Sequence, residues 1–260
     1  MRILLIGDII GKPGRKAVRR LVPGLRQQYG LDLVIANGEN AASGLGITSD
    51  CAEELLASGI DVITSGNHIW EYKEIFPYLD SDHPILRPLN YPKGVPGRGC
   101  LVWKEKLLIV NLIGRVFIGN FDCPFRTMDR LLAEYPRLPI VIDFHAEATS
   151  EKMALGWYLD GRVSAVLGTH THVGTVDARI LPGGTAYITD LGMVGPRQSV
   201  IGDDINAVLQ RFLTQMHHRL TVGRGTVIFN SVMVDLDDTN GKAKAIRRLD
   251  IEAEAALDES

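Results

Sequence analysis

Short apolar runs alternate with longer amphipathic segments along most of the chain. The apolar runs cover residues 2–6, 32–36, 61–64, 139–144 and 163–167, and each is followed within a few residues by glycine, asparagine or histidine. Runs of this length bounded by turn residues predict buried strands. The segments between them carry helix start and stop signals. Strands that alternate with helices in this way are typical of an α/β protein.

The helices expected between these strands begin and end at recognisable residues. Pro13 suits the first turn of the helix that follows it, Asp50 and Glu53 have the spacing of a capping box, and Gly59 marks the end of the same helix. The pattern predicts helices over residues 13–29, 48–59, 71–79, 126–134, 149–159 and 204–216. It predicts further strands over residues 100–103, 107–112, 226–236 and 243–249, and a hairpin over residues 178–189.

The chain shows no internal repeat, no low-complexity tract and no linker. Its 260 residues are within reach of one α/β layer fold with a sizeable core. We therefore expect a single domain over residues 1–260, built as a sandwich of two mixed sheets covered by helices.

The composition and charge of the chain limit its expected partners, site types and cellular location. A net charge of -3 gives no basic field for nucleic acid, so stable nucleic-acid binding is not expected. The three cysteines, Cys51, Cys100 and Cys123, form no C-x-x-C pair, which argues against a disulfide framework and against a thiolate metal site. No stretch resembles a signal peptide or a membrane span. We expect a cytoplasmic protein without membrane contact, and a homo-oligomer is compatible with the sequence.

Polar residues follow the predicted strands at their carboxyl ends. In α/β sheets the loops beyond those ends lie side by side and form the usual binding crevice. Each residue alone has an ordinary structural explanation, such as a helix cap or a turn, but their shared position indicates one site. These residues are Asp8, Glu39, Asn40, Asn67, His68, His145, His170 and His172.

The donor types indicate a metal centre. Carboxylate and amide oxygens with imidazole nitrogens, and no sulfur, suit Mn, Fe or Zn. The set exceeds what one catalytic ion with an open position needs. It suits two ions about 3.5–4 Å apart that share a bridging carboxylate. His170 and His172 are one residue apart in a tight loop, where alternate side chains can face the same cavity.

The ordered motifs resemble the calcineurin-like metallophosphoesterases. The chain has Gly7-Asp8 after its first strand, then "GNH" at residues 66–68, a solitary His145, and "GTHTH" at residues 168–172. The stretches "LLIGDIIGKPGR", "NGENAASGLGIT", "SGNHIW", "DFHAEATSEK", "GTHTHV" and "YITDLGMVGP" are similar to the bacterial YmdB-like branch of that superfamily. The similarity runs over nearly the whole chain.

Two positions depart from the wider superfamily. The usual Asp-x-His opening is Asp8-Ile9-Ile10 here, and Glu39-Asn40 stands where the second motif normally has Asp. The resemblance implies that Glu39 bridges the metals and that Asn40 replaces the missing histidine. It also implies a four-layer α/β/β/α sandwich of two mixed sheets flanked by helices. The resemblance further implies a centre of two metal ions per chain, with Fe or Mn preferred and Zn or Mg also possible. It implies phosphodiesterase activity on substrates that include 2′,3′-cyclic nucleotides.

The expected chemistry is hydrolysis of a small phosphodiester by a hydroxide that bridges the two metals. His68 is the candidate general acid, because Asn67 can serve as the ligand at that position; a structural turn histidine is the alternative. Helix capping explains Glu147, Thr149 and Lys152 as well as catalysis does. A nucleotide-binding module is disfavoured, because the glycines near Lys12 lack the required spacing. A non-catalytic metal-binding regulator or sensor on the same fold stays open.

Overall fold

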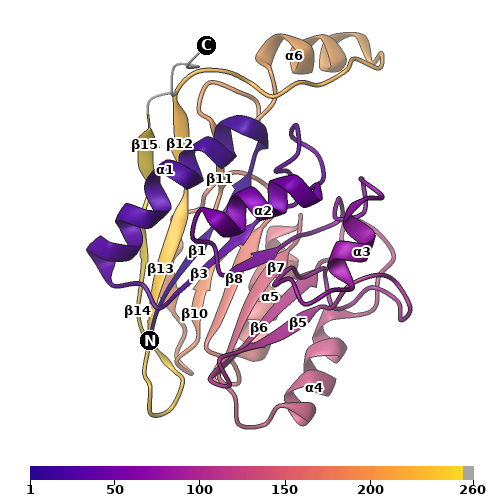
Figure 1. The fold of residues 1–260 in the computed structure, drawn as a ribbon. Coiled ribbons are helices and arrows are strands. Elements are labelled where there is room, and N and C mark those ends of the chain that lie inside the picture. The colour runs from indigo at the N-terminus through magenta and orange to yellow at the C-terminus, as the bar shows by residue number, and fades with distance from the viewer. Residues whose placement is uncertain (254–260) are drawn as a thin grey trace.

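Two large mixed β-sheets form the centre of the molecule, and the computed structural model describes residues 1–253 (Figure 1). The first sheet has five strands in the order β14-β13-β1-β3-β4, and the second has six in the order β5-β6-β7-β8-β10-β9. The strands of the first sheet are β1 (Arg2–Ile6), β3 (Leu33–Asn37), β4 (Val62–Thr64), β13 (Ser231–Leu236) and β14 (Ala243–Arg248). Those of the second are β5 (Cys100–Trp103), β6 (Leu107–Ile113), β7 (Ile140–His145), β8 (Ala165–Thr169), β9 (Arg179–Ile180) and β10 (Ala186–Ile188).

The central strands of both sheets are parallel. In the first sheet β1 pairs with β3 and β3 with β4, and in the second β6, β7, β8 and β10 run the same way. Strand β6 is buried at every position. Parallel strands that are covered on both faces have nearly continuous apolar sequences, and β6 follows this rule. Because neighbouring strands point in the same direction, their carboxyl ends meet along one edge of each sheet.

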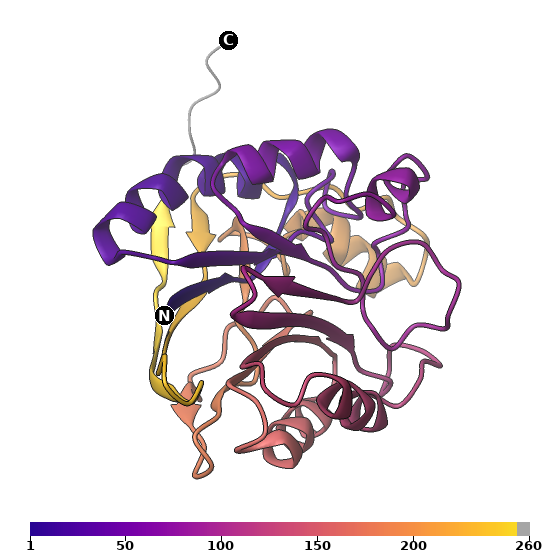
Figure 2. The ribbon, with the colours of Figure 1, turned by 60° about the horizontal axis from the view of Figure 1, so that its bottom comes forward.

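Helices cover the outer faces and complete four layers. Val18 and Leu55 pack on the five-stranded sheet from one side, and Met128 and Leu155 pack on the six-stranded sheet from the other. Between the sheets lies a cluster that includes Leu5. Figure 2 shows this order, with indigo α1 and purple α2 on one outside and α4 and α5 on the other. The α/β/β/α arrangement implied by the sequence motifs is confirmed.

The helices follow the sequence pattern, and most of their ends lie within two residues of the predicted ones. They are α1 (Gly11–Tyr29), α2 (Ser49–Ala57), α3 (Ile75–Leu79), α4 (Pro124–Glu134), α5 (Thr149–Leu159) and α6 (Ile205–Thr214). Helix α3 is shorter than the predicted 71–79. The capping box of Asp50 and Glu53 is wrong, because Thr48 is the N-cap of α2 and its hydroxyl accepts from the Cys51 backbone N–H at 3.2 Å.

A third sheet was not predicted. It has the order β15-β12-β11-β2, with β2 (Asp8–Ile9), β11 (Met193–Pro196), β12 (Val227–Phe229) and β15 (Ile251–Ala253). The run predicted as one strand over 226–236 is divided at Asn230, so that β12 joins this third sheet and β13 joins the first. Gly7 lies between β1 and β2, and a Cβ there would come within 2.1 Å of the Gly192 carbonyl oxygen. This close approach places Asp8 beside β11.

None of the helices in residues 1–253 combines the length and the apolar character needed to span a membrane.

Candidate metal centre

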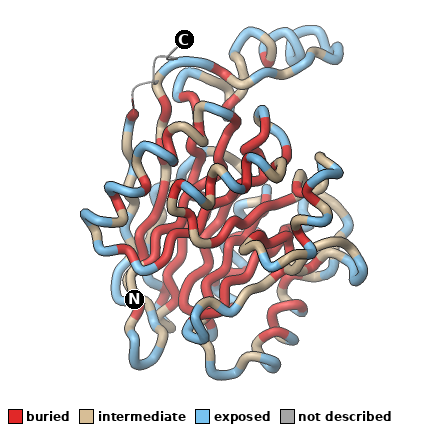
Figure 3. Tube along the Cα trace, viewed as in Figure 1, coloured by how far each residue is buried: buried red, intermediate tan, exposed pale blue. Residues whose placement is uncertain are grey.

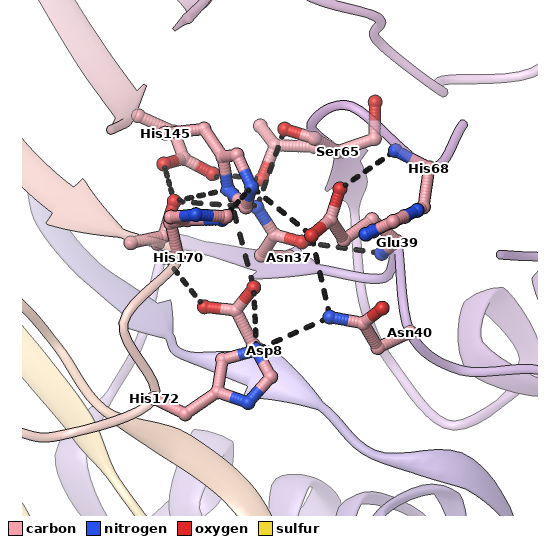
Figure 4. Close-up of polar contacts among 12 residues, drawn as sticks. Asp8, Asn37, Glu39, Asn40, Ser65, His68, His145, His170 and His172 are labelled. Atoms are coloured by element: carbon pink, nitrogen blue, oxygen red, sulfur yellow. Dashed lines mark hydrogen bonds and ion pairs between the residues drawn. The ribbon is translucent and has the colours of Figure 1, made fainter. Parts of the chain in front are cut away.

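The carboxyl ends of strands from both large sheets bring the predicted site residues together (Figure 4). Asp8 comes from β2, directly after β1, while His145 ends β7 and His170 follows β8. Glu39 and Asn40 follow β3. Asp8, Glu39, Asn40 and His145 are all buried. Polar side chains concentrated in a buried position need partners or a cation to balance the cost of desolvation.

Glu39, His145 and His170 form the tightest part of the cluster. One ligand atom from each lies within 4.8 Å of the other two. His145 Nε2 is 3.0 Å from Glu39 Oε1 and 2.9 Å from His170 Nδ1. A carboxylate and two imidazoles converging at this separation could hold a metal ion.

Asp8, Asn40 and His172 lie beside this triad. His172 Nε2 is 3.7 Å from Asp8 Oδ1 and 3.2 Å from Asn40 Nδ2. Asn40 Nδ2 is also 3.3 Å from Glu39 Oε1. Glu39 therefore contacts both groups, His145 on one side and Asn40 on the other.

Asn67 and His68 approach the cluster from the end of β4. The backbone N–H of His68 donates to Glu39 Oε2 at 3.1 Å, and Asn67 Nδ2 is 2.9 Å from His68 Nε2. Just before them, a Cβ on Gly66 would lie 2.2 Å from His145 Nε2 and 2.4 Å from Glu39 Oε2. Only glycine lets this turn pass so close to both side chains. Unlike Glu39, His68 is partly exposed.

Two buried oxygens of the cluster accept no hydrogen bond from the described residues. They are Asp8 Oδ1 and Asn67 Oδ1. The other oxygen of Asp8, Oδ2, accepts from the His170 backbone N–H at 3.1 Å, so the carboxylate is fixed in orientation. A buried acceptor without a donor is costly, and a cation would satisfy both oxygens. The donor set and these two oxygens fit a hard or borderline metal ion.

His145, His170 and His172 are each held with one nitrogen toward the centre of the cluster and the other against an acceptor. His172 Nδ1 is 2.7 Å from the Ile201 carbonyl oxygen, which can only accept, so this nitrogen carries the proton. His170 Nε2 is 3.1 Å from Glu147 Oε2, which leaves Nδ1 to face His145. Fixing the outer N–H of a histidine in this way is how proteins orient metal-binding imidazoles.

His145 is fixed through a hydroxyl. Thr169 Oγ1 donates its only proton to Asp143 Oδ1 at 2.7 Å, so it acts as acceptor toward His145 Nδ1, 3.0 Å away. The Nδ1 atom is therefore protonated and Nε2 faces Glu39. Asp143 also accepts from Asn37 Nδ2 at 3.1 Å and from the Thr64 hydroxyl at 2.5 Å. This buried network joins the two large sheets beneath the cluster.

The electrostatics of the cluster reflect burial and mutual charge. Burial raises the pKa of Asp8 to about 6, against the opposing attraction of His172 and His145. Burial also acts on Glu39 and His145, but their close contact outweighs it, so the pKa of Glu39 falls to about 2 and that of His145 rises to about 9. Burial and the neighbouring His145 lower the pKa of His170 to about 3. His170 is therefore neutral at pH 7, with a lone pair available.

A buried ion pair holds the loop that carries His170 and His172. Lys152 Nζ donates to Asp190 Oδ2 at 2.6 Å and to the Thr169 carbonyl oxygen at 2.7 Å, and Asp190 Oδ2 accepts from the Thr171 backbone N–H at 3.1 Å. Both histidines have positive φ, 99° and 64°, a conformation that non-glycine residues adopt only when their surroundings impose it. The ion pair fixes the backbone on both sides of His170.

Helix capping does not account for Lys152 or its neighbours. Helix α5 has Ala148 as its N-cap and no side-chain cap bond. Lys152 instead holds the histidine loop, and Glu147 contacts His170. The capping interpretation of Glu147, Thr149 and Lys152 is therefore wrong.

The sequence patterns did not single out the supporting residues. Asn37, Asp143, Thr169 and Asp190 are all buried. Asp143 had a usable signal, since it is a charged residue inside the apolar run "IVIDF", and a buried charge requires partners. Thr169 carried none, because a threonine near a strand end is ordinary.

Comparisons with known proteins agree with this arrangement. The chain matches the model of a family described as YmdB-like protein over residues 4–249. It is 50% identical over 254 residues to a 2′,3′-cyclic-nucleotide 2′-phosphodiesterase of Bacillus subtilis (strain 168), covering 96% of each chain.

Two solved structures have the same fold. A hypothetical protein from Thermus thermophilus superposes with a TM-score of 0.92 at 46% identity, over 97% of this chain and 100% of that one. A structure described as a novel phosphatase of Mycoplasma pneumoniae superposes with a TM-score of 0.92 at 33% identity, over 98% of this chain and 94% of that one. Similarity of sequence and fold therefore extends over almost the entire chain.

Proposed function

The chain belongs to the YmdB-like family of phosphodiesterases and phosphatases, and from that membership we propose that it hydrolyses small phosphodiesters, 2′,3′-cyclic nucleotides above all, at a centre of two metal ions. One observation carries the proposal. His145 turns one ring nitrogen toward Glu39, His172 turns one toward Asp8 and His170 turns one toward His145, while an acceptor holds the opposite N–H of each ring. This is the arrangement that metal ligation requires.

The proposed ligands differ in their contacts and in their expected roles. Glu39 is the bridging residue, because Oε1 contacts both His145 and Asn40. The unsatisfied oxygens of Asp8 and Asn67 support their inclusion. A set of oxygen and nitrogen ligand atoms favours Fe or Mn, and it is also compatible with Zn or Mg. The full proposed set is Asp8, Glu39, Asn40, Asn67, His145, His170 and His172.

Two bound divalent ions supply charge that polarises phosphoryl oxygens and acidifies water near neutral pH. The chain's own contribution is to hold the ligands before substrate arrives. Asp8 is fixed by the His170 backbone N–H, and His145 is fixed by Thr169 and Asp143. Ligands that are already oriented add no reorganisation free energy to the reaction barrier.

His68 is the proposed general acid. Its backbone N–H is anchored on Glu39 Oε2, yet its side chain is partly exposed at the edge of the cluster, where a substrate can reach it. Hydrolysis of a 2′,3′-cyclic phosphate breaks a P–O bond to ribose, and the departing oxygen needs a proton. A histidine placed at hydrogen-bonding distance from that oxygen supplies it.

One domain over residues 1–260 is part of the proposal. Strand β1 begins at Arg2 and pairs with β13, which ends at Leu236. The site draws residues from both large sheets, so dividing the chain between them would separate Glu39 from His145.

Turnover assays with defined metal content test the proposed function. Protein purified without oxygen, loaded with Mn or Fe and assayed for metal, should hydrolyse bis(p-nitrophenyl) phosphate and 2′,3′-cyclic nucleotides. Hydrolysis should disappear with a chelator and return when the metal is restored. Protein that holds two ions and turns over neither these diesters nor a wider phosphodiester panel would contradict catalysis and leave a metal-binding regulator.

A further inference from the structure

Three aromatic side chains form a row beside the candidate metal centre. Trp70 follows the proposed general acid His68 by two residues, and its ring meets that of Tyr91 edge to face with the centroids 4.6 Å apart. Tyr91 in turn packs against Phe121 at the same centroid distance, with the rings tilted by 58°. All three side chains are partly exposed. The row therefore leads from the segment of His68 to the loop that follows β6, along a path that solvent can reach.

The loops that carry Tyr91 and Phe121 are held together by one buried side chain, Asn90. Its Nδ2 donates to the carbonyl oxygens of Ile113 at 2.8 Å and of Asp122 at 2.9 Å, and its Oδ1 accepts from the Ile113 N–H at 2.9 Å. The Asp122 N–H donates to the Asn90 carbonyl oxygen at 3.0 Å. The two loops are thus fixed against each other and against the end of β6.

The start of the loop after β6 is also fixed relative to the metal centre. The Gly114 N–H donates to the carbonyl oxygen of His145 at 2.9 Å. The carboxylate of Glu151, buried on α5, then accepts from the backbone N–H groups of Arg115 at 3.0 Å and of Val116 at 3.1 Å. A site whose supporting contacts are built in this way can hold a ligand in one position.

A cavity of about 440 Å³ is lined by residues of both loops, among them Pro92 and Phe121. This volume suits a small-molecule group. Figure 3 shows the central strands in red, whereas the loops beyond them are largely tan and pale blue. The charged residues of the lining are one cation, Arg115, and one carboxylate, Asp122. Their charges cancel, so the cavity suits an uncharged flat group better than a second phosphate.

We propose that this cavity binds the nucleobase of the substrate, with the base stacked on Phe121 while the cyclic phosphate lies at the metal centre. The inference rests on the proposed function, because it assigns a place to the part of that substrate that does not react. Both ester oxygens of a 2′,3′-cyclic phosphate belong to one ribose, so the base lies on the side of the departing oxygen. His68 is on that side, and the aromatic row runs from its segment to the cavity.

Tyr91 supports this placement from the middle of the row. Burial and, after it, the negative charge of Glu39 raise the pKa of Tyr91 to about 12. The hydroxyl therefore stays protonated at pH 7, and the influence of Glu39 reflects the closeness of Tyr91 to the metal centre. Neutral aromatic side chains thus border the path from the centre to the cavity.

Steady-state kinetics with a matched pair of substrates tests the proposal. One is a 2′,3′-cyclic nucleotide, and the other is methyl riboside 2′,3′-cyclic phosphate, which has the same reacting group and a methoxy group in place of the base. The metal-loaded parent protein should have a kcat/KM for the nucleotide that is higher by roughly 5–150-fold, which corresponds to stacking of one base on an aromatic side chain.

Substitutions of Phe121 locate the base. Phe121→Ala should lose the preference for the nucleotide, and the loss should appear in KM, because stacking is the same in the ground state and the transition state. Phe121→Tyr keeps an aromatic ring and should retain the preference. Phe117→Ala is the matched control, since Phe117 is on the same loop and 89% exposed but does not line the cavity, and it should retain the preference too.

The outcomes separate this inference from the proposed function. A parent protein that hydrolyses both substrates equally well would overturn the inference and leave the proposed function intact. A preference that survives Phe121→Ala, or that Phe117→Ala abolishes, would place the base elsewhere and also overturn it. Hydrolysis of neither substrate by metal-loaded protein would contradict the proposed function and the inference with it. If melting curves show that Phe121→Ala does not fold, Phe121→Leu keeps the apolar bulk without the ring and gives the same test.

Discussion

Strand β8 has an ion pair near each of its ends, and the two pairs have the same N–O distance. Before the strand, Arg162 contacts Asp129 at 2.6 Å, and the two side chains are 40% and 41% exposed. Beyond the strand, Lys152 contacts Asp190 at 2.6 Å, and they are 2% and 1% exposed. Distance alone does not separate the two pairs; burial and further contacts do.

The surroundings of the two ends differ in the same way. Near Arg162 lies a cavity of about 640 Å³ whose lining also includes Lys106 and Lys242, and whose charged groups face water. At the other end the polar side chains are buried, two of their oxygens lack donors, and Lys152 holds the backbone on either side of His170. Among the described residues, the buried side-chain oxygens that lack a donor lie at the candidate site, whereas the cavity of about 640 Å³ lies at the other end.

The strongest test of this contrast removes the charge of Glu39. Glu39→Gln keeps the shape but leaves one bridging oxygen neutral, so at least one metal position should empty. Diesterase activity should fall by more than the roughly 10²–10⁴-fold that a single acid–base group contributes. Glu105→Gln, a glutamate that lines the cavity at the opposite end, should keep full activity and metal content. Near-normal turnover with two ions in Glu39→Gln would refute the bridging role.

His68→Ala should give the next largest effect, and only on some substrates. Hydrolysis of a 2′,3′-cyclic nucleotide should slow by roughly 10²–10⁴-fold, because the ribose oxygen departs unprotonated. Hydrolysis of bis(p-nitrophenyl) phosphate should slow far less, since p-nitrophenolate leaves without a proton. Metal content should not change.

The His68 comparison separates three roles. Equal losses on both substrates with metal intact would argue for phosphate positioning, and loss of metal would make His68 a ligand. His83→Ala is the matched control, because His83 contacts Glu53 and Tyr78 outside the cluster, and it should leave both rates unchanged.

Lys152→Met tests the buried ion pair itself. Asp190 would keep its charge in a buried position without its partner, so the free energy of unfolding should fall by about 3–5 kcal/mol. Metal affinity should fall about 10–100-fold, as for other residues that orient ligands; a metal titration measures this separately from folding. Arg162→Met, at the exposed pair, should leave metal affinity unchanged. It should lower the melting temperature far less than Lys152→Met does. Equal effects of the two substitutions would remove the distinction between the ends.

The smallest effect is expected inside the cavity near Arg162. Lys106→Ala changes a residue that lines this cavity and is exposed, and turnover should stay within about twofold of the parent, since surface substitutions away from special features are usually close to neutral. A large loss of activity in steady-state assays would show that the reacting groups extend to this end.

The layered fold could be read from the sequence because its central strands are continuous apolar runs. The third sheet could not, since β2, β11 and β15 have two to four residues and show no periodicity. The division of 226–236 at Asn230 depends on which sheet each half joins, which is a tertiary choice. Helix α6 was predicted, but its apolar face looked like any core-facing face, whereas in the structure most of its apolar side chains are exposed.

The residues of the candidate site could be predicted from the sequence for a similar reason. Parallel strands place their carboxyl ends together, so collecting the polar residues after each strand brought Glu39, His145 and His170 into one set, and the structure places their ligand atoms within 4.8 Å. The roles of the remaining residues as ligands stay a prediction. Asp143, Thr169 and Lys152 act through partners distant in sequence, and no local pattern identifies such contacts.

Anomalous diffraction from crystals of the Mn-loaded protein tests the central claim most directly. Data collected at the manganese absorption edge should show two peaks about 3.5–4 Å apart, one on each side of Glu39, with His145 and His170 next to one and Asp8 and His172 next to the other. A single peak, peaks distant from Glu39, or no peak from metal-replete protein would contradict a two-metal centre at this edge of the sheets.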